Sequence, residues 1–384
     1  MSAIRVVHVG CVLDVARRGG AELLAAWPTL GDVAAAVRAS GADVSVVQAA
    51  HRDERLTLAG VEYHFVTEAR LARPAGDRRP GAVLPFRLAR AVAALTPDVI
   101  HVNGLAFPLH LRALTRAAPR AAMLVQDHAD RPPRRLRWLA RRAFRVVDGV
   151  SFTAREQAEP FLEAGILRAG TRIFEVPESS THFRPGDRAA AGAALGIHGD
   201  PAVLWVGHLD ANKDPLTILD AVALALESLP GLHLWCCFGK APLMGAVRAR
   251  LAADPALAER VHLLGTLLHA QVELACRAAD FLLSGSRRES SGYAVIEALA
   301  CGVTPIAADI PAFRALLGRG AIGALAPCGD AQAFAAHLVN LARSDRDYLR
   351  RRARAHFERV LAFPVIGARL AAAYRELIDT RRAA

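Results

Sequence analysis

The sequence lacks features that would assign it to several common classes of protein. None of its six cysteines belongs to a C-x-x-C pair, and all but Cys328 lie in apolar or helical surroundings, so we expect reduced, buried thiols rather than zinc ligands or disulfides. The longest run without a charged residue is Val99–Leu111, much shorter than the ~20 apolar residues of a membrane-spanning helix. The N-terminus, MSAIRVVHVG, reads as a core strand and has no signal-peptide pattern. These absences indicate a cytoplasmic protein.

Lysine is almost absent, since only Lys213 and Lys240 occur among the 48 basic residues. Such a skew is typical of GC-rich coding, so the formal net charge of +11 is weak evidence for a polyanionic partner. No aromatic residues are interleaved with the basic ones as a stacking platform, and no known nucleic-acid motif occurs. We therefore expect no nucleic-acid partner, and both remaining lysines become residues of interest.

The chain of 384 residues is long enough for two or three domains, and its hydrophobic content of 53% allows a large core. Short β-like runs alternate with Ala/Leu-rich helical stretches, which predicts α/β domains with parallel sheets and right-handed crossovers. The expected helices include Arg87–Leu95, Ala154–Leu162, Leu216–Leu229, Gln271–Ala278 and Ala331–Leu341. The expected strands are Arg5–Val9, Val44–Gln48, Val61–Val66, Val99–Val102, Ala122–Gln126, Gly149–Phe152, Ile173–Val176, Val203–Val206, His233–Phe238, Val261–Leu264, Phe281–Ser284, Thr304–Ala307 and Gly323–Ala326.

This alternation is interrupted at VPESSTHFRPGD, residues 176–187, where two prolines and a polar cluster suit an interdomain linker. We expect a first Rossmann-like domain at 1–183 and a second at 184–362. Doubly wound domains of this kind would face each other across a cleft at the carboxyl ends of their strands. A final helix within 363–384 would pack back on the first domain.

The segment SRRESSGYAVIEALACGVTPIAAD, residues 286–309, has the strongest chemical character. A helix is expected to begin near Gly292, and a helix start with small residues favours a bound phosphate. Glu289 precedes this helix start, and Glu297 lies about one turn inside it, where carboxylates could bond sugar hydroxyls on either side of a phosphate. Two glutamates with this spacing would, on their own, more often be solvated surface residues.

Two further segments follow strand ends. In VLWVGHLDANKDPLTILDAV, residues 203–222, a strand ends at Gly207, and Lys213 lies at the start of the next helix, where its ammonium could reach a diphosphate. The alternative is a surface lysine. In RRGGAELLAAW, residues 17–27, Gly19–Gly20 predicts a tight turn into a helix, although a glycine pair alone is weak evidence.

Polar residues also end two neighbouring strands of the first half. His101 and Asn103 end one strand, and Asp127 and His128 end the next. The carboxyl ends of parallel strands meet at one edge of the sheet, which favours a site there. A single histidine in such a place is as often structural as functional.

Together these segments resemble glycosyltransferase family 4, which comprises retaining glycosyltransferases of the GT-B fold. The matching elements follow the family order over nearly the whole chain. They are GGAE at 19–22, PDVIH at 97–101, DGVSFTAREQAEPF at 148–161, F-x-P at 183–185, VGHLDANK at 206–213, LLGTL at 263–267 and AADFLLSGSRRESSGYAVIEALACGVTPI at 278–306.

The resemblance implies roles for individual residues. Glu289 would contact the donor sugar, Lys213 would neutralise the leaving diphosphate, and His128 would lie beside the reacting sugar. Glu297 would hold the nucleotide ribose. The other donor contacts would come from Gly20, Gly207, His208, Ser291 and Gly292. The family needs no metal, and no cofactor is implied besides the nucleotide diphosphate sugar as substrate.

The sequence departs from the family pattern at two positions. His208 stands where the family usually has an arginine, and a free histidine is only partly charged at neutral pH, so diphosphate stabilisation would depend more on Lys213. Asn103 stands where the family often has a histidine. His101 and Asn103 are therefore candidates for acceptor contacts.

Other chemistries have little support in the sequence. The only D-x-D, Asp345–Asp347, lies far from the motifs, so no metal site is expected. No G-x-S-x-G elbow accompanies Ser284, Ser290 or Ser291, which argues against a hydrolase triad.

The stretch RPPRRLRWLARRAFR, residues 131–145, has seven arginines and no acidic residue. Leu136, Leu139, Ala143 and Val146 or Val147 would form one apolar face of a helix. The first interpretation is a surface helix with a solvated basic face. The alternative is weak attachment to an anionic membrane, where lipid-linked acceptors reside.

These patterns predict a retaining hexosyltransferase that uses a nucleotide diphosphate sugar and a glycan, glycolipid or small-molecule acceptor. Its place would be the cytoplasm or the inner membrane face, and its pathway polysaccharide biosynthesis. The alternatives are a weakly active nucleotide-sugar-binding subunit of a polysaccharide assembly system and a sugar-nucleotide epimerase of the same fold.

Overall fold

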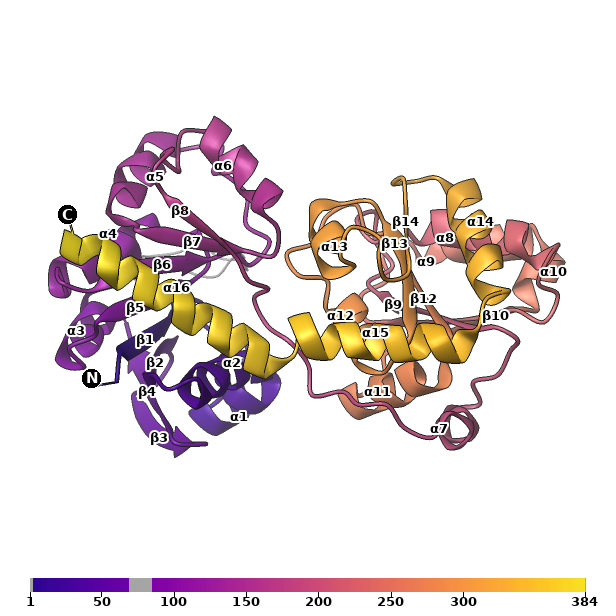
Figure 1. The fold of residues 1–384 in the computed structure, drawn as a ribbon, viewed down its shortest axis with the longest axis horizontal. Helices are drawn as coiled ribbons and strands as arrows, with labels where there is room; N and C mark the ends of the chain where they lie inside the picture. Colours follow the sequence, from indigo (N-terminus) through magenta and orange to yellow (C-terminus); the bar gives the residue numbers. More distant parts are fainter. Residues whose placement is uncertain (1–2, 69–84, 384) are drawn as a thin grey trace. The chain divides into compact units, whose positions relative to one another are not determined.

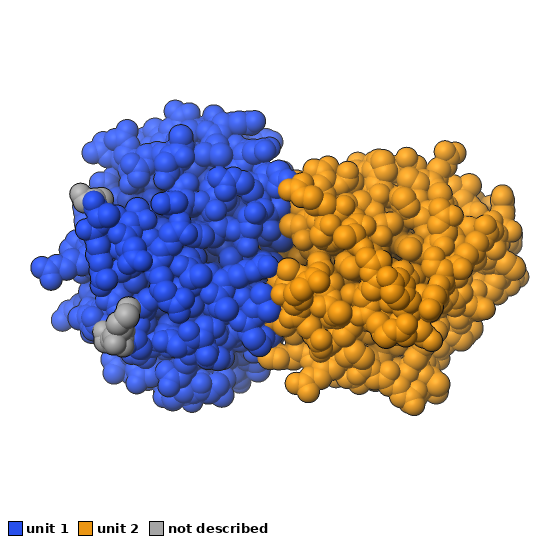
Figure 2. Space-filling view, in the orientation of Figure 1, with its two compact units in different colours: residues 1–179, 363–384 blue, residues 180–362 orange. Residues whose placement is uncertain are grey.

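The computed structural model describes residues 3–68 and 85–383. Its internal contacts divide the chain into two compact units (Figure 2). Unit 1 comprises residues 1–179 and 363–384, and unit 2 comprises residues 180–362. The division falls after Ser179 rather than after residue 183, and the last segment of the chain belongs to unit 1.

Unit 1 is built on an eight-stranded sheet with the order β3-β4-β2-β1-β5-β6-β7-β8 (Figure 1). Only the β3–β4 pair is antiparallel among the described strands. The strands are β1 (Arg5–Gly10), β2 (Asp43–Ala50), β3 (Glu54–Leu58), β4 (Val61–Thr67), β5 (Val99–Asn103), β6 (Ala122–Gln126), β7 (Gly149–Phe152) and β8 (Arg172–Glu175). The helices are α1 (Gly20–Ala26), α2 (Pro28–Ala39), α3 (Phe86–Ala94), α4 (Pro108–Ala117), α5 (Arg137–Ala143), η1 (Phe144–Val146), η2 (Arg155–Ala158), α6 (Glu159–Glu163) and α16 (Phe363–Ala383).

The central strands of unit 1 are covered on both faces. Successive residues of β5 enter different hydrophobic clusters, because side chains alternate between the two faces of a strand. Val99 belongs to the cluster that includes α16, whereas Ile100 and Val102 belong to the cluster that includes α3 and α4. Nearly continuous apolar strands are expected in a parallel sheet buried in this way.

Unit 2 is built on a six-stranded, all-parallel sheet with the order β11-β10-β9-β12-β13-β14. The strands are β9 (Ala202–Gly207), β10 (His233–Phe238), β11 (Val261–Gly265), β12 (Phe281–Ser284), β13 (Thr304–Ala308) and β14 (Ala324–Ala326). The helices are α7 (Arg188–Leu195), α8 (Pro215–Leu226), α9 (Met244–Ala252), α10 (Pro255–Ala258), α11 (His269–Ala278), α12 (Tyr293–Ala300), α13 (Pro311–Leu316), α14 (Ala331–Ala342) and α15 (Arg346–Val360). The expected doubly wound α/β architecture of each unit is confirmed.

The helix α16 lies across unit 1 and contacts α2 and β6 (Figure 1). Its Tyr374 is fully buried, with Oη 3.1 Å from His8 Nε2 and 2.6 Å from His101 Nδ1. These two histidines come from the adjacent strands β1 and β5. Residues from the end of the chain therefore complete the core of the unit that contains its beginning.

Two elements of unit 1 differ from the sequence-based expectation. The strand β3 was not expected, and the expected helix Ala154–Leu162 is divided into the 3-10 helix η2 and the short helix α6. No helix in the described part of the chain is long and apolar enough to cross a membrane.

Candidate functional site

The loop between β12 and α12 holds the strongest sequence motif. Gly292 is the N-cap of α12 with φ of +67°, and a Cβ added there would lie 2.5 Å from the ring of Phe313, so only glycine fits without rearrangement. Ser290 and Ser291 are buried beside it. The start of α12 thus presents small residues and the positive end of a helix dipole, which together suit a phosphate group.

Lys213 and Glu289 are brought together by this loop and the loop after β9. The Lys213 ammonium forms an ion pair with Glu289 Oε1. Both side chains are mostly covered, with 22% and 13% of their surfaces exposed. The aliphatic part of Lys213 passes over Gly207, where a Cβ would lie 3.3 Å from it. The two residues assigned to the donor by resemblance are therefore neighbours at the carboxyl edge of the unit 2 sheet.

Backbone and side-chain hydrogen bonds hold these two loops together. Asp210 Oδ1 accepts from the N–H of Lys213 at 2.9 Å and so fixes the turn that presents the ammonium. Asn212 Nδ2 donates to Arg288 O at 3.0 Å, and Arg287 pairs with Asp214 at 2.6 Å. The position of Glu289 therefore depends on the loop that carries Lys213.

His208 lies at the same edge, exposed and bonded to the loop after β10. Its Nδ1 accepts a hydrogen bond from the backbone N–H of Lys240 at 3.2 Å. Because an amide can only donate, the accepting nitrogen carries no proton, and the ring presents Nε2–H. Lys240 is exposed and follows β10, as Lys213 follows β9. The sequence singles out Lys240 as one of two lysines but assigns it no role. Its position shortly after the end of a strand is the feature that could have placed it at this edge of the sheet.

Glu297 lies inside α12 and is 9% exposed. Its Oε1 is 3.1 Å from Nε2 of His269, the first residue of α11. His269 also lies against Phe183, with ring centroids 4.7 Å apart. The carboxylate is thus held in place, and its expected contact with a nucleotide ribose stays a prediction.

In unit 1 the Gly19–Gly20 turn begins α1. The N–H of Gly19 donates to Glu22 Oε2 at 3.0 Å, and the N–H of Gly20 donates to Glu54 Oε2 at 2.8 Å. A Cβ on Gly20 would lie 2.5 Å from the ring of Phe65. The unexpected strand β3 supplies Glu54 and so positions this turn. The contact of Gly20 with a diphosphate stays a prediction.

A cavity of about 400 Å³ lies in unit 1, lined by residues near the ends of β1, β5 and β6. Trp27, Leu30 and Phe107 supply apolar surface, and Asp130 and Glu178 supply carboxylates. The lining residues are His8, Gly10, Cys11, Val12, Trp27, Thr29, Leu30, Val33, Gln48, Asn103, Gly104, Ala106, Phe107, His128, Asp130 and Glu178. Sequence reasoning found Asn103 and His128 of this set and missed the two carboxylates.

His128 is the polar centre of the cavity wall. Its Nδ1 pairs with Glu178 Oε2 at 2.8 Å, and its Nε2 lies 3.3 Å from Asn103 Oδ1. Burial alone would lower the pKa of His128, but the hydrogen bond and charge of Glu178, with smaller effects of Asp130 and Asp127, raise this pKa overall. The ring therefore has an acceptor at each nitrogen.

His101 does not lie in this cavity, which corrects its assignment as an acceptor contact. Its side chain is fully buried and bonded to Tyr374. Alternation along β5 places His101 on the same face as Val99 and Asn103, but at His101 this face is covered by Tyr374 of α16, whereas Asn103 is the last residue of the strand.

The basic segment at residues 131–145 also differs from its expected form. The helix α5 begins only at Arg137, and Leu136 precedes it in a left-handed conformation with 63% of its surface exposed. Trp138 is 64% exposed, whereas Ala140 and Ala143 are buried. Leu136 therefore lies outside the predicted apolar face, whereas Leu139 is half-buried and Ala143 and Val147 are buried as expected. Leu136 and Trp138 are two large apolar side chains exposed among the arginines.

Comparison with known proteins gives consistent results for sequence and fold. Residues 200–344 match the family model described as "Glycosyl transferases group 1". D-inositol 3-phosphate glycosyltransferase of Nocardia farcinica is 34% identical over 255 residues, covering 64% of this chain and 55% of that protein. The enzyme of the same name from Mycolicibacterium gilvum is 35% identical over 169 residues, covering 42% of this chain and 37% of that protein. The matched region thus spans about half or less of these relatives.

Solved structures resemble the chain over almost its full length. A glycosyltransferase from Rickettsia africae has a TM-score of 0.71 at 13% identity, covering 98% of this chain and 99% of that one. Anabaena Alr3699/HepE in complex with UDP has a TM-score of 0.69 at 19% identity, covering 97% of this chain and 100% of that one. At these identities the similarity establishes the fold.

Proposed function

We propose that this protein transfers a hexosyl group from a nucleotide diphosphate sugar to an acceptor hydroxyl, because residues 200–344 match the model of group 1 glycosyltransferases and the chain has the GT-B fold. The observation that carries the proposal is the paired Lys213 and Glu289 next to the start of α12. Solved relatives in complex with UDP and with UDP-glucose support a nucleotide sugar as donor.

In this proposal the donor diphosphate lies at the start of α12 and replaces Glu289 as the ion-pair partner of the Lys213 ammonium. The diphosphate gains negative charge as the glycosidic bond breaks, so a fixed cation and a helix dipole stabilise the transition state more than the ground state. Glu289, released from Lys213, accepts hydrogen bonds from the sugar hydroxyls. The acceptor oxygen bonds to the anomeric carbon on the face from which the diphosphate oxygen departs, and the hydroxyl proton passes to that diphosphate, so the configuration is retained. No step requires a metal.

We place the acceptor in the cavity of unit 1, beside Asn103 and His128. The cavity combines apolar walls with Asp130 and Glu178, and none of its described lining residues is lysine or arginine. A phosphate group would meet the two carboxylates there and, apart from histidine, no basic side chain among the described lining residues. The acceptor is therefore a neutral or amine-bearing polyol, unlike the D-inositol 3-phosphate in the names of the sequence relatives.

We also propose that the protein works in the cytoplasm, at the inner face of the membrane, in polysaccharide biosynthesis. The exposed Leu136 and Trp138 lie among exposed arginines such as Arg134 and Arg135. An aromatic ring and cationic groups together are the combination that binds the interface of an anionic bilayer. Lipid-linked acceptors would be presented at that surface.

The first experiment is a donor screen by native mass spectrometry with UDP-, GDP- and dTDP-sugars. The donor that binds is then incubated with a neutral glycoside, an amino sugar, inositol and D-inositol 3-phosphate, with and without EDTA. We expect transfer to a polyol without phosphate, in an α-linkage from an α-donor, at a rate that EDTA does not change. Transfer only to D-inositol 3-phosphate would refute the acceptor assignment. Complete loss in EDTA, restored by manganese or magnesium, would refute metal independence.

The same screen separates the alternatives. Binding of a donor without hydrolysis or transfer to any acceptor would favour a non-catalytic subunit. Inversion at C2 of the donor sugar, without transfer, would favour an epimerase. Neither alternative is favoured by the sequence relatives, whose names are those of glycosyltransferases.

A further inference from the structure

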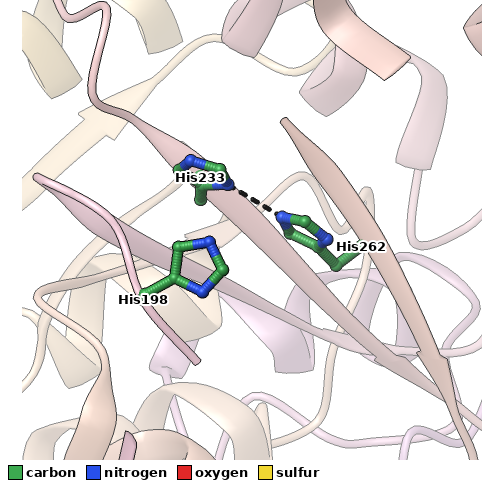
Figure 3. Close-up of side chains that lie close together, drawn as sticks. All are labelled: His198, His233 and His262. Atoms are coloured by element: carbon green, nitrogen blue, oxygen red, sulfur yellow. Dashed lines mark hydrogen bonds between the residues drawn. The ribbon is translucent and has the colours of Figure 1, made fainter. Parts of the chain in front are cut away.

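Three histidines meet at the amino-terminal edge of the unit 2 sheet, away from the site described above (Figure 3). His198 lies in the loop between α7 and β9, His233 is the first residue of β10, and His262 is the second residue of β11. The strands β10 and β11 are parallel neighbours, so their amino-terminal ends lie side by side. The six residues of β10 place this edge about 17 Å from the loop that follows the strand.

The distances between the rings suit a small cation. One nitrogen from each ring lies within 4.8 Å of the others. His233 Nδ1 is 2.8 Å from His262 Nε2, and the ring of His198 lies 4.5 Å from that of His233 between centroids. Nitrogen ligands at 2.0–2.1 Å from a tetrahedral ion are roughly 3.3 Å apart. Small rotations of the three side chains would therefore give the distances that the ion requires.

The hydrogen bonds define the tautomers without an ion. Arg260 Nη1 lies 3.0 Å from His233 Nε2, and because a guanidinium can only donate, this nitrogen accepts. His233 then carries its proton on Nδ1 and donates it to His262 Nε2. An ion between these two nitrogens would take the place of that proton, which would move to Nε2 of His233. Arg260, half-buried, would have to turn away.

Surrounding groups orient the other two rings. His198 Nδ1 lies 2.9 Å from Gly196 O, and only a protonated nitrogen can donate to a carbonyl, so Nε2 keeps its lone pair. Trp235 stacks on His262 with centroids 3.9 Å apart and an angle of 17°. The Trp235 indole also donates to His198 O at 2.9 Å. Outer contacts of this kind fix the ring orientation in protein metal sites.

Burial favours the neutral form of two of the three rings. Burial, with smaller effects of His198, His262 and Arg260, lowers the pKa of His233 to about 4. Burial and the charge of His198 also lower the pKa of His262. Neutral imidazoles are the form that binds metals.

From this geometry we propose that His198, His233 and His262 form a binding site for a divalent transition metal ion of the zinc class. Three imidazoles without a thiolate suit Zn²⁺, Co²⁺, Ni²⁺ or Cu²⁺ rather than Mg²⁺ or Ca²⁺. His198 is exposed, which leaves an open path for the ion and a fourth position for water.

The proposed ion has a structural role. It links the loop after α7 to β10 and β11, and binding to the folded state alone stabilises that state. Because the opposite edge of the sheet carries Lys213 and Glu289, the ion would raise the thermal stability of unit 2 and leave transfer unchanged. The metal site can therefore be disproved while the proposed transferase function holds, and the transferase function can be disproved while the metal site holds.

The test uses the full chain with any histidine tag removed and metals stripped by EDTA. Zn²⁺ is titrated by calorimetry, Co²⁺ by visible absorption, and Ni²⁺ by quenching of Trp235 emission. We expect a single ion per chain, the intense visible bands of four-coordinate Co²⁺, and a higher melting temperature with Zn²⁺. His198→Ala and His262→Ala should each weaken binding by at least about tenfold. Arg260→Gln should tighten it.

Two variants serve as controls. Trp235→Phe keeps a ring on His262 and should bind Zn²⁺ while losing the Ni²⁺ quenching. His337→Ala removes a half-buried histidine of the same unit, on α14, and should bind like the wild type. Since His198 is an exposed loop residue, its variant remains informative if His262→Ala misfolds. Wild-type affinity in His198→Ala, or a Co²⁺ spectrum of the hydrated ion, would overturn the proposal.

Discussion

Lys213 and Glu289 are separated by 76 positions in the sequence and form one ion pair in the structure. Each side chain is mostly covered, so removing one partner leaves the other with a poorly solvated charge. Substitutions at these two residues should therefore be non-additive, because each changes the surroundings of the other. His208, exposed and bonded to the backbone of Lys240, has no such dependence on Glu289.

We expect Lys213→Ala to lower kcat/KM by about 10²-fold or more, because one preorganised stabiliser of the leaving diphosphate is lost. His208→Ala should cost less, since its ring offers only an Nε2–H. His208→Arg should be tolerated and restores the cation usual in the family. The measurement is kcat and kcat/KM at pH 6, 7 and 8, with Lys240→Ala as the matched lysine control. A Lys213→Ala enzyme near the wild-type rate would show that this loop does not serve the diphosphate.

Glu289→Gln should lower turnover more than tenfold while circular dichroism shows an intact fold. The amide keeps the size of the side chain but loses the charged acceptor for sugar hydroxyls and the ion pair with Lys213. Kinetics with a verified donor measure the effect, and the Lys213→Ala/Glu289→Gln double variant measures the coupling. Unchanged kinetics in the single variant would remove Glu289 from the donor site.

The sequence identified the motif residues of the candidate site in unit 2, but it did not identify the carboxylates that contact the candidate residues of unit 1. Gly292 and Lys213 were found because helix starts, strand ends and glycine positions leave local patterns. The carboxylates Glu54 and Glu178 were missed, because they approach Gly20 and His128 through tertiary contacts that no local spacing records. His101 was misplaced for the same reason: alternation along β5 places it on one face with Asn103, but only the tertiary contact with Tyr374 of α16 shows that this face is covered at His101.

Among the secondary-structure elements, β3 is an edge strand that the hydrophobic pattern of the sequence does not reveal. Its sequence, ERLTL, is mostly exposed because it pairs on one side only, at the edge of the sheet. Edge strands carry charged residues and little apolar alternation, so their pattern resembles a loop. The buried central strands, by contrast, were all expected within a few residues of their observed bounds.

The short helix α5 and the residues before it lead to a prediction about membranes. Trp138, Leu136 and the surrounding arginines should bind anionic vesicles weakly, and co-sedimentation should fall with salt, because exposed charges are screened over ~10 Å at 0.1 M. Arg134/Arg135/Arg141/Arg142→Ala should lose most of this binding, and Trp138 emission should shift to the blue on vesicles of the wild type only.

A charge-matched control distinguishes a specific surface from net charge. Arg319/Arg343/Arg351/Arg359→Ala removes four exposed arginines from unit 2 and should sediment like the wild type. If both quadruple variants and the wild type sediment alike, the basic face of 131–145 is solvated and has no part in membrane binding.

At the scale of the whole molecule, the buried histidines His8 and His101 make the stability of unit 1 depend on pH. Burial lowers the pKa of His8 to about 4, and burial with the charges of His8 and His128 lowers the pKa of His101 well below its usual value. Both rings are neutral in folded unit 1 and titrate near 6.5 when unfolded. The unfolded chain therefore binds more protons below pH 6.5, and the stability of unit 1 falls as pH falls from 6.5 towards 4.

We expect the urea midpoint of unit 1 to be lower at pH 5 than at pH 7, with His8 alone costing about 3 kcal/mol by pH 4. Fluorescence of Trp27 and Trp138 follows this unit, in a background with the other two tryptophans replaced by phenylalanine. His8→Asn should have a smaller dependence on pH, because its side chain does not titrate. Equal midpoints at pH 7 and 5, or an equal slope in His8→Asn, would contradict the expectation.

The contact of Tyr374 with His8 and His101 has a consequence for biosynthesis. A ribosome makes residues 1–179 before unit 2 and Phe363–Ala383 after it. While unit 2 is being synthesised, His8 and His101 of unit 1 lack their hydrogen bonds to the Tyr374 hydroxyl. The apolar face of the unit 1 sheet also lacks the side chains of α16 that cover it, among them Ile366, Leu370 and Leu377. Unit 1 can thus complete its folding only after unit 2 and α16 have been synthesised. A chain that ends before Phe363 would expose this apolar face of unit 1 to chaperones and proteases.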